Sequence, residues 1–298
     1  MKSWIAAARP RTLPLALASI ILGSFLALAA GQFNQRIFML AALTTIFLQI
    51  LSNFANDYGD AVSGKDTAER VGPQRAVATG LITRKSMLWG MVVTALLALI
   101  SGIWLLVEAF WDASPETFYL FLGLGLLSIG AAIAYTNGKR PYGYSGLGDI
   151  AVLIFFGWVG VLGTYFLHTH YFSFATMLPA TSVGLFATGV LNVNNIRDIE
   201  TDAKTGKRSI PVRLGRQRAT GYHWSLLIAG MACAVAYTLL TGWNSYLDWL
   251  YLLSFPLFIL NGYKVATHRQ PAELNPRLGQ LAMTTLLFVL LFGVGQVW

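Results

Sequence analysis

The stretch IFMLAALTTIFLQILSNFANDYGD, residues 37–60, is apolar for most of its length and ends in two asparagines and two aspartates. A helix needs about 20 apolar residues to cross a hydrocarbon layer of roughly 30 Å. The window Ile37 to Phe54 is close to that length. The stretch therefore predicts a membrane-spanning helix whose final turns carry amide and carboxylate side chains.

The whole chain has the same character. Of its 298 residues, 55% are hydrophobic and only 11% are charged, which excludes an ordinary soluble domain. Windows of membrane-spanning length recur between charged or turn residues. We therefore predict an all-α, polytopic membrane bundle of nine transmembrane helices. The windows are Leu13 to Ala30, Ile37 to Phe54, Met87 to Val107, Phe118 to Tyr135, Ile150 to Leu167, Phe174 to Val193, Tyr222 to Leu240, Leu247 to Val265 and Leu278 to Trp298.

The basic residues predict the orientation of this bundle. Lys and Arg in short loops are retained on the cytoplasmic side of a membrane. All but one of the 21 Lys and Arg residues lie in the N-terminal segment or in even-numbered loops, and the exception is Arg36. The pattern predicts a cytoplasmic N-terminus. Topology and contact with anionic lipid account for the net charge of +8, so we expect no nucleic-acid partner.

Two long connections on the cytoplasmic side hold most of the remaining polar residues. They run from about 56 to 86 and from about 195 to 221, and we expect them to cap a single membrane-embedded domain of residues 1–298. The only cysteine, Cys233, falls inside a predicted helix. A disulfide framework and a thiolate metal site are both excluded.

The sequences that introduce these two connections echo one another. A shift of 141 residues superimposes Asn53 on Asn194 and Asp57 on Asp198. At 3.6 residues per turn, the polar residues of each motif share one helix face. The two predicted faces consist of Asn53, Asp57 and Asp60, and of Asn194, Asp198 and Asp202.

Carboxylates at a helix C-terminus repel one another and the helix dipole, so a cation should compensate them. Mg²⁺ prefers oxygen ligands and is commonly held by one or two carboxylates together with substrate phosphates. Basic side chains near both motifs would bind the other phosphate oxygens. These are Lys139, Arg140, Arg197, Lys204, Lys207 and Arg208.

Four motifs make the chain recognisable, and they resemble those of the UbiA superfamily of intramembrane aromatic prenyltransferases. The motifs are RPRTLPLA (residues 9–16), QILSNFANDYGDAVSGKD (49–66), YTNGKRPYGYSGLGD (135–149) and NVNNIRDIETDAKTGKRS (192–209). The family pattern NDxxDxxxD is matched by Asn56, Asp57 and Asp60. It departs at Gly64, where many relatives have Asp, and Asp66 follows two residues later.

This resemblance implies a helical bundle with a lipid-accessible lateral cavity and a Mg²⁺-dependent site at its cytoplasmic end. Asp57, Asp60, Asp198 and Asp202 would be the metal ligands, and Tyr135 and Lys139 would form the family's YxxxK element. The asparagines Asn53, Asn56 and Asn194 would join the basic residues in binding substrate. We expect Arg11 to bind the carboxylate of the acceptor.

Within the superfamily, the motifs are most similar to those of enzymes of menaquinone biosynthesis. The implied reaction moves a polyprenyl group from its diphosphate to 1,4-dihydroxy-2-naphthoate, releases CO₂ and diphosphate, and gives demethylmenaquinol. The implied location is a bacterial plasma (inner) membrane, in contact with its lipid. Two alternatives stay open: another aromatic acceptor, 4-hydroxybenzoate or homogentisate, and, from a different class, a secondary transporter with paired polar helix segments.

Overall fold

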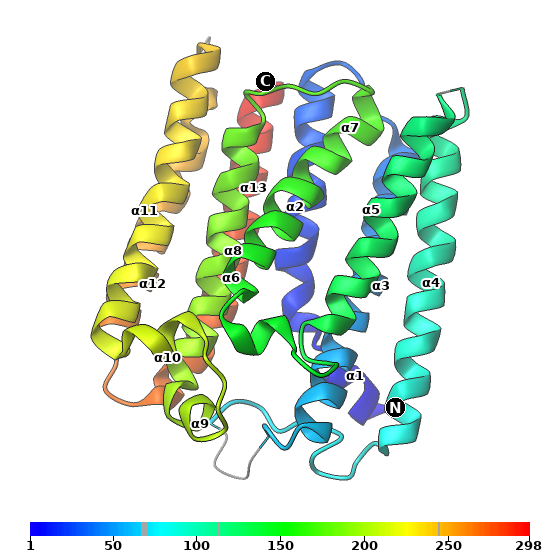
Figure 1. Cartoon of the computed structure of the whole chain (residues 1–298). Coiled ribbons are helices and arrows are strands. Elements are labelled where there is room, and N and C mark those ends of the chain that lie inside the picture. The colour runs from blue at the N-terminus through cyan, green and yellow to red at the C-terminus, as the bar shows by residue number, and fades with distance from the viewer. Residues whose placement is uncertain (67–70, 113, 244) are drawn as a thin grey trace.

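A computed structural model describes residues 1–66, 71–112, 114–243 and 245–298, and these residues form helices and connections without a β-strand (Figure 1). The predicted all-α class is confirmed. The elements are α1 (Lys2–Ala8), η1 (Pro10–Thr12), α2 (Leu13–Ala29), α3 (Gln35–Val62), α4 (Arg84–Phe110), α5 (Pro115–Ala134), η2 (Tyr142–Ser145), α6 (Gly148–Val152), η3 (Leu153–Leu162), α7 (Gly163–Thr169), α8 (Met177–Arg197), α9 (Ile199–Lys204), α10 (Ile210–Leu214), α11 (Arg216–Thr241), η4 (Tyr246–Ser254), α12 (Phe255–Ala266), η5 (Pro271–Leu274) and α13 (Asn275–Val297).

Seven helical segments in the described part of the chain are long and apolar enough to cross a membrane. Two of the nine predicted windows fall outside this set. Helix α8 carries Asn192, Asn194 and Asn195 near its end, and the continuous segment of η4 and α12 includes the polar residues Asp248, Asn261 and Lys264. The protein is a multi-pass membrane protein, whereas the count of nine crossings stays a prediction.

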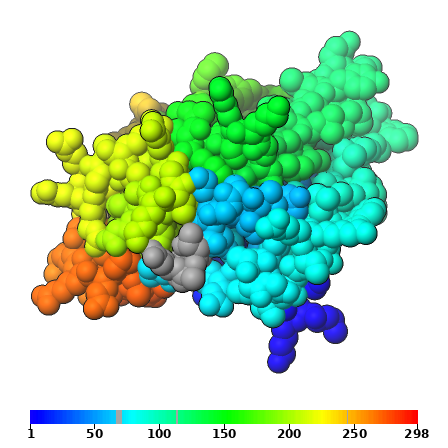
Figure 2. All heavy atoms as spheres, turned by 60° about the horizontal axis from the view of Figure 1, so that its bottom comes forward, coloured from blue at the N-terminus to red at the C-terminus, as the bar shows by residue number. Residues whose placement is uncertain are grey.

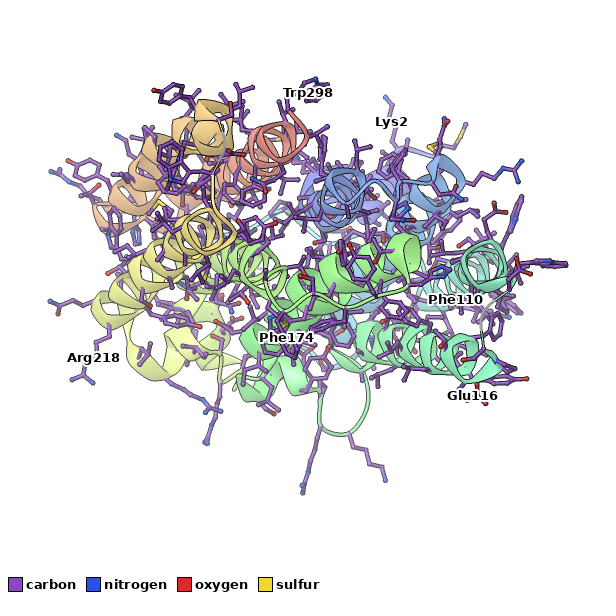
Figure 3. The ribbon with its side chains drawn as sticks, turned by 90° about the horizontal axis from the view of Figure 1, so that it is seen from above. Lys2, Phe110, Glu116, Phe174, Arg218 and Trp298 are labelled. Carbon is purple, nitrogen blue, oxygen red and sulfur yellow. The ribbon has the colours of Figure 1, made fainter. Side chains whose placement is uncertain are left out.

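The long helices lie side by side, and both polar motifs lie at one end of the bundle. Helices α3 and α8 end at the lower side of Figure 1, where the N-terminus also lies, and the C-terminus is at the opposite end. Seen end-on in Figure 3, the bundle extends from Arg218 of α11 to Phe110 of α4 and Glu116 of α5. The expected convergence of the two motifs is therefore observed.

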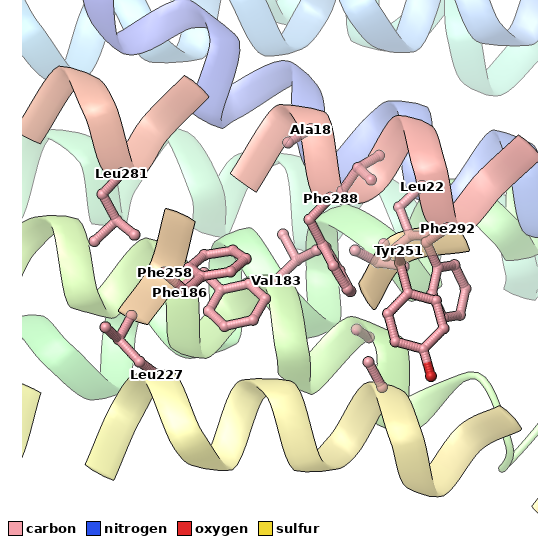
Figure 4. Packing of buried hydrophobic residues seen from close by; sticks show 14 of the residues in the cluster. Ala18, Leu22, Val183, Phe186, Leu227, Tyr251, Phe258, Leu281, Phe288 and Phe292 are labelled. Atoms are coloured by element: carbon pink, nitrogen blue, oxygen red, sulfur yellow. The ribbon is translucent and has the colours of Figure 1, made fainter. Parts of the chain in front are cut away.

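An aromatic core holds the half of the bundle built from α2, α8, α11, η4, α12 and α13 (Figure 4). The rings of Phe186 and Phe258 stack with 4.0 Å between their centroids, and Phe288 meets Phe186 edge-on. Glycine allows this packing, because a Cβ at Gly230 would lie 2.5 Å from the Phe186 ring. Lipid tails are as apolar as these rings, so close van der Waals packing, rather than transfer out of water, holds this half of the bundle together.

The caps begin later than the sequence predicts, because α3 continues to Val62 and α8 to Arg197. Short helices α9 and α10 form most of the second cap. The two caps meet beneath the bundle, blue-cyan against yellow-green in Figure 2. The Lys65 ammonium donates to the carbonyl of Thr205. Residues 67–70 of the first predicted cap lie outside the described residues.

Candidate active site

A cavity of about 870 Å³ extends from the caps into the bundle. Residues of α2, α3, α5, η3 and α8 line it. On α3 the lining runs from Ala41 to Asp60, about 28 Å along the helix at 1.5 Å per residue. The walls are mostly apolar, and the capped end is polar. The lining carboxylates and motif asparagines are Asn56, Asp60, Asn194, Asn195, Asp198 and Asp202.

One wall of the cavity is a π-helix, η3, which follows α6 directly. Its side chains Phe155, Phe156 and Trp158 line the cavity, as does Tyr135 at the end of α5. The Ser19 hydroxyl of α2 donates to the Phe156 carbonyl of η3 at 2.5 Å, which ties this wall to α2. Further aromatic side chains, Phe121, Phe166 and Phe172, line the cavity from other elements.

Asp60 and Asp202 share one cation at the polar end. The Lys207 ammonium lies 3.4 Å from the Asp60 carboxylate and 3.5 Å from that of Asp202. Asp60 is also paired with Arg75 and accepts a hydrogen bond from the Tyr144 hydroxyl. Asp60 is 1% exposed, so its negative charge depends on these partners.

A repeated backbone motif places these two aspartates. The sequences DAVSGK (residues 60–65) and DAKTGK (202–207) both end a helix with a glycine of positive φ, 66° at Gly64 and 75° at Gly206. In each, the lysine N–H donates to the aspartate carbonyl at 2.9 Å. This is the Schellman pattern of helix termination. The shift that relates the two ends is 142 residues.

Asp198 has a different environment. The Arg197 guanidinium donates to both of its carboxylate oxygens, at 2.8 and 2.7 Å. The same guanidinium donates to the Asn194 side chain at 2.8 Å and to Asn275 at 3.0 Å. The bidentate geometry fixes the Asp198 carboxylate at the cavity rim.

Asp57 and Asn53 turn away from the cavity, although the sequence predicts them on its face. The Asp57 carboxylate accepts hydrogen bonds from the backbone N–H groups of Ala76 and Val77, at 3.0 and 3.1 Å. This contact docks the first cap on α3 and holds the neighbouring Arg75 against Asp60. Asn53 instead contacts the N-terminal segment through Ala8. Neither residue lines the cavity.

Gly64, where the sequence departs from the family pattern, ends helix α3. The helix ends there in a left-handed conformation that an aspartate would adopt only with strain. Asp66 does not take its place at the cavity. Its carboxylate lies 3.8 Å from Nε of Arg75 and does not line the cavity.

Most of the other basic residues predicted to bind substrate lie outside the cavity. Lys207 is the one that lines it, and Arg197 is buried behind Asp198. Of the predicted YxxxK pair, Tyr135 lines the cavity and Lys139 is exposed. The remaining exposed side chains are Arg11, Arg140, Lys204 and Arg208.

Sequence reasoning missed two residues that contact Asp60, namely Arg75 and Tyr144. Arg75 is 8% exposed and lies in a cap whose fold no periodicity predicts. Tyr144 belongs to a quoted motif, and its ring lies 5.1 Å beneath the Lys207 ammonium. The repeated DAxxGK sequence is the signal that could have paired Asp60 with Asp202.

Electrostatics supports a shared anionic site. Burial raises the pKa of Asp202 above its ordinary value of 3.8, and the nearby charges of Asp198 and Asp60 raise it further, while Lys207 lowers it. Burial, and then the Asp60 charge, raise the pKa of Tyr144. The carboxylates of Asp60, Asp198 and Asp202 therefore lie close enough for their charges to interact.

The carboxylate oxygens at this end suit Mg²⁺ as a shared cation. Among the described residues, no three His, Cys, Asp or Glu side chains form a preassembled metal site. The Lys207 ammonium nevertheless already bridges Asp60 and Asp202. A divalent cation at this end would meet oxygen donors, and phosphate and water would complete its shell, as Mg²⁺ prefers.

Comparison with known proteins decides the family. A model of the UbiA prenyltransferase family matches residues 16–292. The chain belongs to the UbiA prenyltransferase family. Two curated UbiA relatives are both called 1,4-dihydroxy-2-naphthoate octaprenyltransferase. The protein of Haemophilus influenzae is 47% identical over 99% of this chain and 96% of its own length. That of Escherichia coli is 45% identical, over 99% and 94%.

Solved structures of UbiA homologs share the fold. The apo structure from Aeropyrum pernix K1 matches with a TM-score of 0.71 and 18% identity, over 96% of this chain and 97% of that one. A homolog from Archaeoglobus fulgidus bound to DMAPP and Mg²⁺ matches with a TM-score of 0.63 and 16% identity, over 99% of both chains. At these identities the likeness concerns the UbiA fold alone.

Proposed function

We propose that this protein transfers a polyprenyl group from an allylic polyprenyl diphosphate to 1,4-dihydroxy-2-naphthoate, in a Mg²⁺-dependent step of menaquinone biosynthesis. One observation carries the proposal: Lys207 bridges Asp60 and Asp202, from separate motifs, at the mouth of a long apolar cavity. A substrate with an anionic head and an apolar tail fits both parts. The relatives at 45–47% identity support this acceptor.

Three aspartates are the metal ligands in this proposal, namely Asp60, Asp198 and Asp202, because they line the cavity. Asp57 has a positioning role instead, since it holds the cap that carries Arg75. When bound, Mg²⁺ neutralises charge on the diphosphate. Asn56 and Asn194 line the same rim and supply amide groups to the substrate oxygens.

Departure of the diphosphate is the step that the basic residues assist. The allylic carbon–oxygen bond breaks, and its electron pair leaves with the diphosphate. Lys207 and Arg75 line the cavity at that level, and Arg197 stands behind Asp198. Fixed cations that meet a growing negative charge stabilise the transition state more than the ground state.

The aromatic wall protects the allylic cation that remains. Phe155, Phe156 and Trp158 line the cavity, and an aromatic face beside a desolvated cation is worth roughly 1–2 kcal/mol. The acceptor carbon that bears the carboxylate then forms the new carbon–carbon bond. Loss of CO₂ returns the electron pair to the ring, so the products are the prenylated diol, CO₂ and diphosphate.

We also propose that the capped end faces the cytoplasm of a bacterial plasma membrane. The caps and the N-terminal segment, which lie together, contain most of the Lys and Arg residues. The diphosphate would then enter from the aqueous side that holds Mg²⁺. The prenyl tail would stay among apolar side chains and lipid.

Purified protein tests the proposal directly. With Mg²⁺, a polyprenyl diphosphate and 1,4-dihydroxy-2-naphthoate, we expect release of diphosphate and CO₂ and formation of the prenylated diol. If the protein prenylated 4-hydroxybenzoate or homogentisate but not 1,4-dihydroxy-2-naphthoate, the acceptor named in this proposal would be wrong. If the protein formed no prenylated product but carried either substrate into liposomes together with a cation, that result would instead support a transporter.

A further inference from the structure

Two arginines flank Pro10 in the N-terminal segment, and only one of them lines the cavity. Arg9 is partly buried and lines it, whereas Arg11, which the sequence suggested for the acceptor carboxylate, is exposed and does not. The two residues have the same chemistry and are two positions apart. Their different placement makes them a matched pair.

The backbone at Arg9 adopts a conformation that non-glycine residues rarely take. Its φ and ψ angles are 49° and 67°, in the left-handed region, at the junction of α1 and η1. Such a conformation is strained for a residue with a side chain and persists only where neighbouring contacts enforce it. It turns the chain sharply between two helical segments.

Asn53 supplies those contacts from α3. Its side-chain amide donates to the carbonyl of Ala8 at 2.8 Å and to the hydroxyl of Thr12 at 3.1 Å. The Thr12 hydroxyl in turn donates to the carbonyl of Arg9 at 2.9 Å. A buried asparagine thus holds the chain on both sides of Arg9 and fixes where the arginine enters the cavity.

The clamp fixes the backbone at Arg9 beside Asn53 rather than beside Asp60. Asn53 precedes Asp60 by seven residues, about 10 Å along α3 and deeper in the bundle. The other cations that line the cavity, Arg75 and Lys207, both pair with Asp60. A prenyl carbon attached to a diphosphate at Asp60 lies on the deeper side, and the attacking acceptor ring must lie beside it.

We infer that Arg9 is the specificity-determining residue that binds the carboxylate of the aromatic acceptor, and that Asn53 is its positioning residue. The inference rests on the proposed prenyl transfer. The planar guanidinium matches a carboxylate in a bidentate fashion. The acceptor keeps this group until the carbon–carbon bond has formed, so Arg9 orients the ring toward the allylic carbon.

Two stable compounds that differ only in the carboxylate test this role. Calorimetry compares binding of 1-hydroxy-2-naphthoate and 1-naphthol to the full-length protein in detergent. We expect the carboxylate to strengthen binding about 10- to 100-fold in the unchanged protein, as charged hydrogen bonds do. The ratio of the dissociation constant of 1-naphthol to that of 1-hydroxy-2-naphthoate should fall to near one in Arg9→Gln. Arg9→Lys should retain part of this ratio.

Controls separate this role from a structural one. Arg11→Gln removes the same charge two residues away and should leave the ratio unchanged. Asn53→Ala should weaken binding of the naphthoate and leave that of 1-naphthol unaltered, whereas a merely structural defect would weaken both. If the Arg9 guanidinium instead binds the diphosphate, Arg9→Gln should raise KM for the polyprenyl diphosphate and leave the binding ratio unchanged. That result would overturn the inference.

The proposed function and this inference fail in different ways. Calorimetry needs no turnover, so an intact dependence on Arg9 without any prenylated product would overturn only the proposed reaction. Normal turnover with the same binding ratio in Arg9→Gln would overturn only the role of Arg9.

Discussion

Asp60 and Asp202 are separated by 142 positions in the sequence, and their carboxylates lie within 3.4 and 3.5 Å of the same Lys207 ammonium. Each aspartate begins a DAxxGK sequence that ends its helix in the same way. The lysines also reach across: Lys65 of the first sequence donates to the Thr205 carbonyl of the second. Two copies of one helix ending therefore build a single anionic site.

Lys207→Ala should lower kcat about 100- to 1,000-fold, the usual effect of losing one donor to a developing negative charge. The lysine contacts both aspartates and would contact the leaving diphosphate. Steady-state kinetics with saturating Mg²⁺ measures this effect. Lys85→Ala, an exposed lysine at the same end of the bundle, is the matched control and should retain full activity.

Asp57→Asn and Asp60→Asn should differ in their response to Mg²⁺. Asp60→Asn removes a proposed ligand and should raise the half-saturating Mg²⁺ concentration at least tenfold. Asp57→Asn loses a charged acceptor of two backbone N–H groups and should cost about 1–3 kcal/mol of stability without that change. Mg²⁺ titrations and thermal unfolding compare the two. An equal loss of Mg²⁺ affinity in both variants would restore Asp57 as a ligand.

The helices and the convergence of the motifs were predictable because hydrophobic length and basic-residue bias act over whole segments. The direction of single side chains was less accessible. A turn of 100° per residue places Asn53, Asp57 and Asp60 near one face, yet the cap binds Asp57 and the N-terminal segment binds Asn53. Partners distant in sequence decide between residues that share a helix face.

Arg75 shows the same limit from the opposite side. Its cap lacks a periodic pattern, so its contact with Asp60 depends on tertiary docking that Asp57 secures. Lys139 was predicted to act from its motif, and its exposed position leaves that role a prediction. Local sequence identified the motif but not which of its side chains enters the cavity.

Gly64→Asp would restore the common family pattern and should nevertheless weaken the protein. A Cβ at Gly64 meets no atom within 4 Å, so the cost is the left-handed backbone alone, about 1–2 kcal/mol. We expect a lower unfolding midpoint and no lower Mg²⁺ requirement. Gly80→Asp, with φ of 74° and equally open space, controls for the backbone cost away from the site. A lower Mg²⁺ requirement in Gly64→Asp alone would show that the new carboxylate joins the metal site.

The raised pKa of Asp202 should make stabilisation by Mg²⁺ depend on pH. The folded-state pKa lies above the ordinary 3.8, so protonation of Asp202 favours the folded state at low pH. Without Mg²⁺, the protein loses this stabilisation by the Asp202 proton as pH rises from about 4 through the folded-state pKa. Mg²⁺ binds only the ionised carboxylate, so the increase in unfolding midpoint that it causes should grow over the same range. Thermal unfolding with and without Mg²⁺ between about pH 4 and 7 measures both trends. Asp202→Asn should flatten them, and an unchanged pH dependence in this variant would assign the effect to another group.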